Sequence, residues 1–466
     1  MSETEIESHA GTSQVDVIIA GGGIAGILTA ARLIADRPEL TVLLLETEET
    51  PGGRAKTLTN TRDSSAGWSY GLGSLSDDLV TFWDQALKTD PEASDLTPFL
   101  TGRVETFGEL SSGKLSQLPV GDLPTAKGAR LIGGLAASRD WQNPLELTLA
   151  GDGEEQTPDF STFWKKGRKS PASLVMEAIG PVLGVPNIWA VAPAALRDRL
   201  KNLSKGPWIG DWLGAAWATL DVLTKTGRFT FLPASHVVSA HFRDHQWFVK
   251  SRKGEFQSAA LVIAQPPWQT IEWLAQSDWS PVPLQIANRT RPVSMVVVFE
   301  KMRIPRPEAA PDLLWIAAEQ TLARFGRDGT VCLQVALEFE MSMDHPTVVK
   351  AVRRIKRAKK RLEGQFPGLL GDKDHIALLP VAWAPSALHA DRRWLAKLDN
   401  QAFQKPHLCW VGDAWGSSYD GDANIIRSVT ATAQTIATKG KGARKVAAAE
   451  STMTNEADLT AIEAPQ

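Results

Sequence analysis

Three glycines near the N-terminus have the spacing of a phosphate-binding turn. Gly21, Gly23 and Gly26 form a G-x-G-x-x-G motif directly after the apolar run 15–20. The first glycine permits a tight turn from strand to helix, the second lets a pyrophosphate approach the backbone, and the third lets helix and strand pack closely. The phosphates would face the N–H groups of the first helical turn, which contains Ala25. The motif predicts a dinucleotide site.

An acidic residue follows the next apolar run at the distance that such a site requires. Residues 42–45 are VLLL, and Glu46 follows them, 20 positions after Gly26. An acid at this place accepts hydrogen bonds from the ribose hydroxyls of the dinucleotide. The glycine motif alone would be weak evidence. Strand, helix, second strand and terminal acid occur in order, and together they predict dinucleotide binding.

Two glycines and an arginine stand just beyond Glu46. In the segment Gly52-Gly53-Arg54 the backbone can pass close to a cofactor while the guanidinium forms paired hydrogen bonds with the pyrophosphate. With this segment, residues 15–58 resemble the N-terminus of the FAD-dependent amine oxidase superfamily, which includes monoamine and polyamine oxidases, protoporphyrinogen oxidase and phytoene desaturases. The resemblance implies bound FAD.

The resemblance also implies a cofactor segment in the middle of the chain. Residues 247–249 and 259–267 are similar to the returning strands of the family. The strand before them carries Val237 and Val238, one of which would contact the adenine through its backbone.

A third cofactor segment lies near the C-terminus. Residues 408–413 (LCWVGD) are similar to the strand end of the family that contributes Gly412 and Asp413, and the acid there binds the ribityl chain. A helix starting near Asn424 would point its N-terminus at the flavin pyrimidine ring. The other cofactor residues that the resemblance implies are Gly73 and Ile425.

The sequence departs from the amine oxidase pattern where substrate chemistry is decided. The family's lysine, which contacts flavin N5 through water, falls on Ser294 or Met295 in the strand 291–299. The tyrosine of the amine-binding cage falls on Asp422, and the usual small pair falls on residues 425–426, which are both isoleucine. These departures favour a relative that removes hydride from carbon over a plain amine oxidase.

Asp422 is the candidate for a general base, although it can equally cap the C-terminal helix. His236 and His241 are more distant alternatives. The chain has 17 Trp but only two Tyr. We expect Trp383 and Trp415 to line a substrate site together with Ser294, with core packing as the alternative for the two tryptophans. Ligand sites prefer apolar clefts at domain interfaces.

Three functions remain open at this stage. The first is an FAD-dependent oxidoreductase that removes hydride from a carbon of a mostly apolar or aromatic small molecule. The second is a flavoprotein amine oxidase that acts on an amine or amino acid. The third is a non-catalytic FAD-binding redox sensor or protein-assembly factor.

Composition fits a cytoplasmic enzyme. The formal net charge of −3 gives no general attraction to nucleic acid. The two cysteines, Cys332 and Cys409, lie in apolar runs, so a reducing compartment is expected. Cys409 would be an inert core residue, and we therefore expect non-covalent FAD. We predict no metal site. Oligomeric state is left open.

The predicted fold is α/β (α+β overall): a Rossmann-type FAD-binding domain with a parallel sheet, plus a substrate domain of mixed sheet and helices. One helix, residues 349–362, is strongly basic on one side. It predicts either a solvated face or a contact with a membrane surface or an acidic protein. Residues 102–170 are expected to contain long loops. The FAD domain comprises 14–95, 225–290 and 400–440, the substrate domain 96–224 and 291–399, and the disordered ends 1–13 and 441–466.

Overall fold

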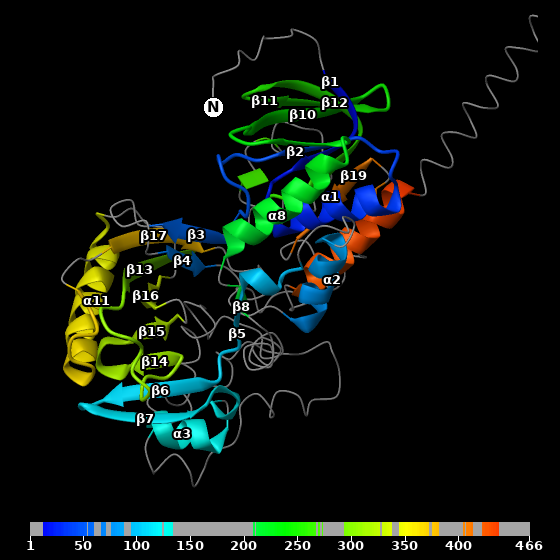
Figure 1. The fold of residues 1–466 in the computed structure, drawn as a ribbon. Helices are drawn as coiled ribbons and strands as arrows, with labels where there is room; N and C mark the ends of the chain where they lie inside the picture. The colour runs from blue at the N-terminus through cyan, green and yellow to red at the C-terminus, as the bar shows by residue number, and fades with distance from the viewer. Residues whose placement is uncertain are drawn as a thin grey trace, which may run out of the picture.

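The computed structural model shows two lobes, each built around one β-sheet (Figure 1). The predicted N-terminal segment, apart from Ser13, and the predicted C-terminal tail lie outside the described residues. The structure describes residues 13–53, 55–59, 67–70, 76–87, 95–123, 125–133, 208–209, 211–266, 269–270, 273, 293–326, 329–337, 344–371, 375–381, 404–405, 407–412 and 422–437.

Eight strands form the first sheet. They are β1 (Ser13–Ala20), β2 (Val42–Leu45), β9 (Phe229–Leu232), β10 (Val237–Arg243), β11 (Gln246–Ser251), β12 (Gly254–Ile263), β18 (Gln404–Lys405) and β19 (Leu408–Trp410). The order is β10-β11-β12-β1-β2-β9, with β19 paired to β12 and β18 paired to β19. β19, β12, β1, β2 and β9 run parallel, whereas β10 and β11 form an antiparallel hairpin on β12. The predicted Rossmann-type parallel sheet is confirmed.

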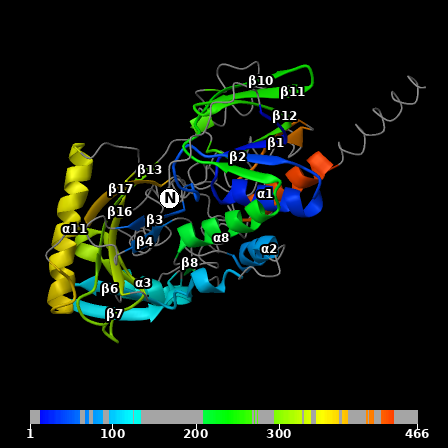
Figure 2. The same cartoon turned by 45° about the horizontal axis from the view of Figure 1, so that its top comes forward.

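Both faces of the first sheet are covered, which is why its central strand is a continuous apolar run. Val17 and Ile19 of β1 face a core shared with α1 (Ile24–Asp36), α2 (Asp77–Leu87), α8 (Trp212–Lys225) and the C-terminal helix, residues 422–437. Ile18 and Ala20 face the other core, which contains Trp247. The helices α1, α2 and α8 lie on one side of the sheet in Figures 1 and 2.

The predicted boundary of the substrate domain at residue 224 is wrong for α8. This helix packs against α1 and α2, and the rings of Trp212 and Trp83 lie 6.1 Å apart between centroids. Trp83 Nε1 also donates a 2.8 Å hydrogen bond to Thr219 Oγ1. The apolar spacing of α8 predicted a helix correctly, but a helical stripe does not tell which core it will join.

Seven strands form the second sheet in the order β17-β13-β16-β15-β14-β6-β7. Its two faces carry different side chains. Val296, Val298 and Leu110 pack in one core with the long helix α11 (Pro346–Gln365). The opposite face, here called the inner face, lies away from α11. The strands are β6 (Thr106–Ser111), β7 (Lys114–Pro119), β13 (Val293–Lys301), β14 (Leu313–Ile316), β15 (Thr321–Phe325), β16 (Thr330–Ala336) and β17 (His375–Val381).

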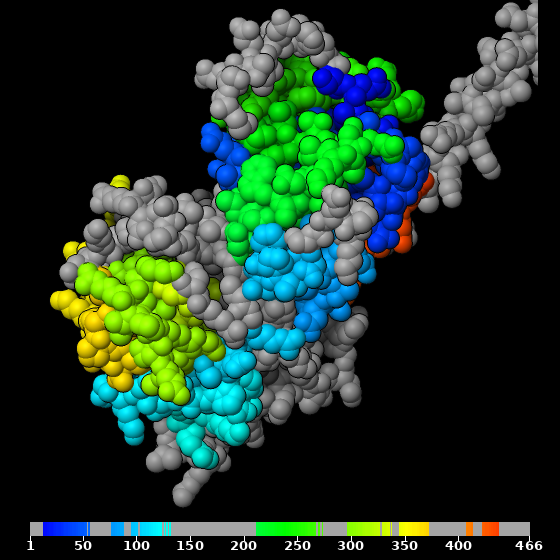
Figure 3. Space-filling view, viewed as in Figure 1, coloured from blue at the N-terminus to red at the C-terminus, as the bar shows by residue number. Residues whose placement is uncertain are grey.

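The region that we expected to be a long loop begins with a β-hairpin. β6 and β7 are joined by Ser112 and Gly113, which have φ angles of 52° and 76°. A two-residue turn with both φ angles positive matches the twist of paired strands, and glycine adopts such angles readily. The Ser-Gly pair between two runs of alternating apolar and polar residues could therefore have predicted this hairpin. In Figure 3 this cyan region forms the end of the second lobe farthest from the first sheet.

Several short elements complete the described structure. β4 contacts β16 and so connects the glycine-rich segment after β2 to the second sheet. These elements are β3 (Lys56–Thr59), β4 (Gly67–Tyr70), η1 (Thr97–Phe99), β5 (Leu100–Gly102), η2 (Val120–Asp122), α3 (Ala126–Gly133), β8 (Trp208–Ile209) and η5 (Ala317–Glu319).

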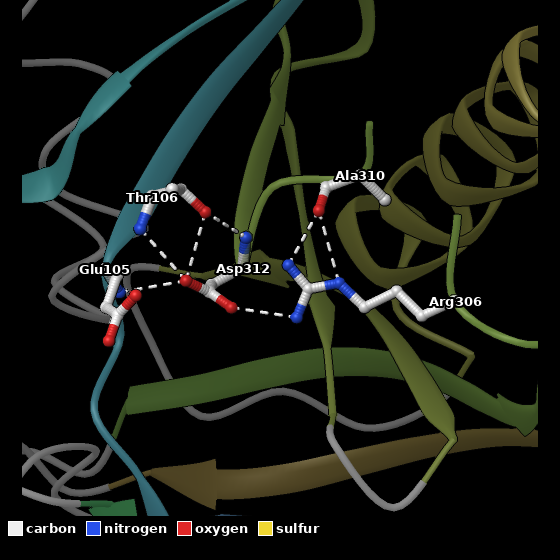
Figure 4. A network of polar contacts seen from close by, with 5 residues as sticks. All are labelled: Glu105, Thr106, Arg306, Ala310 and Asp312. Carbon is white, nitrogen blue, oxygen red and sulfur yellow. Dashed lines mark hydrogen bonds and ion pairs between the residues drawn. The ribbon is translucent and has the colours of Figure 1, made fainter. Parts of the chain in front are cut away.

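A half-buried carboxylate, that of Asp312, ties the segment before β14 to the start of β6 (Figure 4). Asp312 Oδ2 accepts hydrogen bonds of 2.8 to 3.0 Å from the backbone N–H of Glu105 and from the N–H and Oγ1 of Thr106. Its Oδ1 accepts a 2.8 Å hydrogen bond from Arg306. Burial alone would raise the pKa of Asp312, but these donors outweigh it and lower the pKa below the ordinary value.

We expect Asp312→Ala to lower the free energy of unfolding by about 2–4 kcal/mol, because Arg306 and two backbone N–H groups lose their acceptor. The pKa of Asp312 is depressed, so its contribution is present above the unfolded-state pKa and is lost as pH falls through the folded-state value. Denaturant unfolding at pH 7 and pH 3 measures both effects. Glu308→Ala, on the exposed part of the same loop, is the control. Equal stability of the two variants at pH 7 would contradict the assignment.

Candidate functional site

The turn from β1 into α1 requires glycine at its first and last motif positions. Gly21 has φ = 113°, a conformation that side chains rarely adopt, and its N–H donates to Leu45 O at 2.8 Å. A Cβ atom on Gly26 would lie 1.9 Å from the carbonyl oxygen of Gly21. The close contact of helix and strand therefore depends on the missing side chain of Gly26.

The N-terminus of α1 is open to an anion. Its N-cap residue is Gly23, which makes no side-chain cap, and its first turn contains no acidic residue. A Cβ on Gly23 would meet only Gly53 Cα at 3.7 Å and Gly52 O at 4.0 Å, which are ordinary contact distances. Ala25 lies buried in the first turn, and its contact with the cofactor stays a prediction. Such an N-terminus offers unpaired N–H groups and the positive end of the helix dipole.

Glu46 lies at the end of β2, directly beside the glycine motif. Its Oε2 accepts a 2.7 Å hydrogen bond from the N–H of Gly22, and its Oε1 accepts one of 3.0 Å from the N–H of Glu48. The side chain is buried. Glu46 therefore fixes the loop and also presents a carboxylate where the sequence motif predicts ribose contact.

The segment before β10 runs alongside Glu46. The N–H of Ser235 donates to Glu46 O at 2.6 Å, and His236 Nδ1 lies 3.5 Å from Thr47 Oγ1. Val237 is 1% exposed, whereas Val238 is 42% exposed and has no register partner on β11, because the pairing shifts at this point. Of the two valines, Val238 is therefore the one whose backbone is not paired with β11, and the adenine contact stays a prediction for both. His236 therefore lies at the end of the site that contains Glu46.

The C-terminal segment returns to the same edge of the sheet. Val411 N donates to Ile263 O, and Gly412, with φ = 127°, donates its N–H to Ser428 Oγ at 3.1 Å. The helix expected near Asn424 begins within two residues of it, at 422. Ile425 packs in the first core, so only its backbone can take part in a cofactor site.

Asp422 lies in the first turn of this helix, and its contacts are those of a tie between helices. Its Oδ2 accepts a 2.7 Å hydrogen bond from the N–H of Ser76. Ser76 in turn caps α2, because its Oγ accepts from Leu79 N at 3.2 Å. This contact ties the C-terminal helix to α2, and the roles of Asp422 as general base or as cap of its own helix stay predictions.

Some predicted residues cannot be placed. Ser294 lies in β13 with its backbone paired to Pro380, and its side chain is outside the described part of the chain. The other predicted residues that lie outside the described residues are Arg54, Gly73, Trp383, Asp413 and Trp415.

The inner face of the second sheet carries a buried acid that the sequence did not reveal. Glu109 of β6 pairs with Trp315 of β14 on one side and Ser116 of β7 on the other. Its neighbour Leu110 faces α11, so alternation along the strand turns Glu109 to the inner face. Burial raises the pKa of Glu109 from 4.5 to about 7.

Two more titratable residues share this face. Arg324 of β15 and Cys332 of β16 are paired in register. Burial lowers the pKa of Arg324 to about 10 and raises that of the Cys332 thiol to about 12. The inner face is thus not purely apolar.

Comparisons with known proteins agree with this geometry. A family model described as an NAD(P)-binding Rossmann-like domain matches residues 19–75. Among solved structures, a candidate protoporphyrinogen oxidase from Exiguobacterium sp. 255-15 has a TM-score of 0.63 at 14% identity, covering 91% of this chain and all of that one. Wild-type putrescine oxidase bound to putrescine has a TM-score of 0.61 at 17% identity, covering 92% of this chain and all of that one. Cyclohexylamine oxidase from Brevibacterium oxydans IH-35A has a TM-score of 0.59 at 14% identity, covering 90% of this chain and 99% of that one.

The chain has the FAD-binding amine oxidase fold. A search of curated proteins gave no match. The described residues that the sequence predicts to bind the cofactor are far apart in the sequence. In the structure they lie along the carboxyl edge of the parallel strands, where open α/β sheets bind ligands.

Part of the basic face of α11 is used inside the molecule. Arg357 and Arg361 donate to the buried carboxylate of Glu319 at 2.7 and 3.0 Å, and Lys359 lies 3.3 Å from Glu300. Burial alone would raise the pKa of Glu319, but the two arginines lower it. The expected contact of this helix with a membrane surface or an acidic protein stays a prediction.

In the part of the chain that the structure describes, no helix is long and apolar enough to cross a membrane. The same residues contain no group of three or more His, Cys, Asp or Glu side chains that could hold a metal ion.

Proposed function

We propose that this chain is an FAD-dependent oxidoreductase. The observation that carries the proposal is the uncapped N-terminus of α1 between Gly23 and Gly53, with the Glu46 carboxylate beside it. This arrangement fits a dinucleotide diphosphate and its adenosine ribose.

The rest of the site supports FAD as the dinucleotide. The bulge at Val238 offers backbone groups next to Glu46, as an adenine would require. Gly412 and the helix that begins at 422 bring a further chain segment to the sheet edge, in addition to the segments of a simple nucleotide-binding fold. The N-terminal N–H groups of that helix supply positive potential for a flavin ring. The buried sulfur of Cys409 lies in the first core, which supports non-covalent binding.

When bound, FAD supplies the hydride acceptor, and the protein orients the substrate. Gly23 and Gly53 would hold the diphosphate, Glu46 the ribose, and Gly412 the region near the flavin. Asp422 would keep the C-terminal helix in place through Ser76. The finer proposal is hydride removal from a carbon of a mostly apolar small molecule, supported by the absence of the family's lysine at residues 294–295.

Amine oxidation is the second candidate. It is supported by two of the structural neighbours, which are named as oxidases of putrescine and cyclohexylamine. It is also supported by Glu109, a buried acid on the inner face. For both candidates we propose a reducing compartment, the cytoplasm, and the buried thiols of Cys332 and Cys409, which form no disulfide, support this.

The direct test of this function is the colour and reduction of the purified protein. We expect an absorbance band of oxidised flavin and release of intact FAD on acid denaturation. Under anaerobic conditions, matched sets of amines and of apolar carbocycles without nitrogen would then be screened for bleaching of that band. Protein without flavin, even after incubation with FAD, would refute the proposal. Bound flavin that no compound reduces would favour the redox-sensor or assembly-factor alternative.

Glu46→Ala is expected to weaken FAD binding by about 1.5–3 kcal/mol, the range for hydrogen bonds to a charged group. The loss has two causes: the ribose loses its acceptor, and Gly22 loses the 2.7 Å contact that shapes the loop. Flavin retention during dilution and gel filtration measures it. Glu49→Ala removes a charge from the same loop at an exposed position and is the control. Equal retention in both variants would remove Glu46 from the site.

A further inference from the structure

The helix α11 carries eight Lys and Arg residues but one acidic residue, Glu363. That acid is occupied at the end of the helix, where its two carboxylate oxygens accept hydrogen bonds from the N–H groups of Gly368 and Leu370. The whole chain has a formal net charge of −3, so the excess of positive charge on this helix is local. A basic helix in a weakly acidic chain attracts anions to one part of the surface.

The cations of α11 gather on the side of the helix that points away from the second sheet. The residues that face the sheet are buried, and they are Val348, Ala351, Ile355, Ala358 and Leu362. The helical repeat places exposed cations on the opposite side. These cations, here called the basic stripe, are Lys350, Arg353, Lys356, Arg357 and Lys360. The stripe extends about 15 Å along the helix.

Most of the basic stripe is not neutralised inside the molecule. Among the described residues, no acidic side chain pairs with Lys350, Arg353 or Lys360. Arg357 does pair, with Glu319, but its side chain stays 58% exposed. Cations three and four positions apart on a helix repel one another, and an ordinary solvated helix has acids interspersed among them. A layer of negative charge outside the protein would remove this repulsion.

Apolar side chains are exposed beside the same stripe. Val349 is 37% exposed and lies four positions before Arg353, on the same side of the helix. Ile304 is 39% exposed, and the N–H of its neighbour Arg303 donates to Leu369 O just beyond the end of α11. Cations with exposed apolar residues beside them suit a helix that lies on lipid headgroups. Contacts with nucleic-acid phosphates would give these apolar side chains no role.

We propose that the basic stripe of α11 docks on an anionic lipid surface, with the charged groups of the lipid heads as its acceptors. Each Lys or Arg close to such a surface strengthens binding about fivefold. In Figures 1 and 2, α11 lies along the outer side of the second lobe, away from α1 and α8. A bilayer against the stripe would therefore leave the glycine motif accessible. The inference goes beyond the oxidoreductase function proposed above and does not depend on it.

The test is co-sedimentation of the full chain with lipid vesicles. At about 0.1 M salt we expect binding to phosphatidylcholine vesicles that contain about 30% phosphatidylserine, and at least about tenfold weaker binding to phosphatidylcholine alone. The triple variant Lys350→Gln, Arg353→Gln, Lys360→Gln should bind the anionic vesicles about a hundredfold more weakly than wild type. All three positions are exposed, so the fold should tolerate the change.

A second triple variant is the matched control. Arg243→Gln, Lys250→Gln, Lys253→Gln removes the same charges from exposed positions on β10, on β11 and in the turn after β11. Because these positions belong to the first sheet, the control should stay within about threefold of wild type. Equal weakening by the two triple variants would overturn the proposal, and so would equal binding of wild type to the two kinds of vesicle.

Two further measurements keep the proposal open to refutation if the stripe variant does not fold. Binding of wild type to anionic vesicles must weaken between about 0.1 and 0.5 M salt, and binding that does not change would refute an electrostatic contact. Poly-glutamate and duplex DNA are titrated under the same conditions. Tighter binding of either polymer than of the anionic vesicles would assign the stripe to an acidic protein or a nucleic acid and overturn the lipid proposal.

Discussion

Replacing Gly26 with alanine is expected to abolish FAD retention and to lower the free energy of unfolding by about 3 kcal/mol, near the top of the usual range for an overpacked site. The new Cβ would lie 1.9 Å from Gly21 O, and both positions are fixed by backbone. α1 must therefore move away from β1. That movement opens the first core and displaces the helix N-terminus that faces the predicted diphosphate.

Denaturant unfolding and flavin absorbance after gel filtration measure the two effects of Gly26→Ala separately. Gly364→Ala, in the last turn of α11, is the matched control, because a Cβ there has no atom within 4 Å. The control should be unchanged or more stable by up to about 1 kcal/mol, since alanine favours helix. A Gly26→Ala protein that keeps both stability and flavin would show that the close contact between α1 and β1 is not needed.

Glu109→Gln is expected to stabilise the ligand-free protein at pH 8 by about 3 kcal/mol and to have little effect at pH 4.5. The folded state raises the pKa of Glu109 from 4.5 to about 7, so the native carboxyl holds its proton where the unfolded one has lost it. Stability therefore falls between pH 4.5 and 7 and levels off above. At about 1.4 kcal/mol for each pKa unit, a rise of about 2.5 would give about 3.5 kcal/mol, and partial solvent screening of the carboxyl group lowers this to about 3.

The measurement is the difference in unfolding free energy between wild type and Glu109→Gln across pH 4.5 to 8. Taking the difference cancels the titration of all other groups that the two proteins share. Glu105→Gln, exposed at the entrance to the same strand, should show no such pH dependence. A constant difference between wild type and Glu109→Gln would mean that Glu109 titrates normally.

The sequence by itself determined the cofactor-binding half of the protein. The glycine motif, the second strand and Glu46 are within 26 residues of one another, and each makes a local turn or strand end that short-range sterics enforce. The predicted strand 42–45 and the helix near Asn424 were therefore placed closely. The same short-range reasoning predicted that Gly52 and Gly53 lie close to the N-terminus of α1.

Only the tertiary structure decided which distant groups meet. Asp312 accepts a hydrogen bond from Thr106, 206 positions away, and Glu319 forms ion pairs with Arg357 and Arg361 of α11. The helix α8 packs in the first core instead of the second. Glu109 is the opposite case: it is buried because the β6–β7 hairpin pairs with β14, and none of the described residues pairs with its carboxylate. Local rules fix the conformation of a segment, but burial and charge pairing depend on the surface that covers it, and that surface comes from elsewhere in the chain.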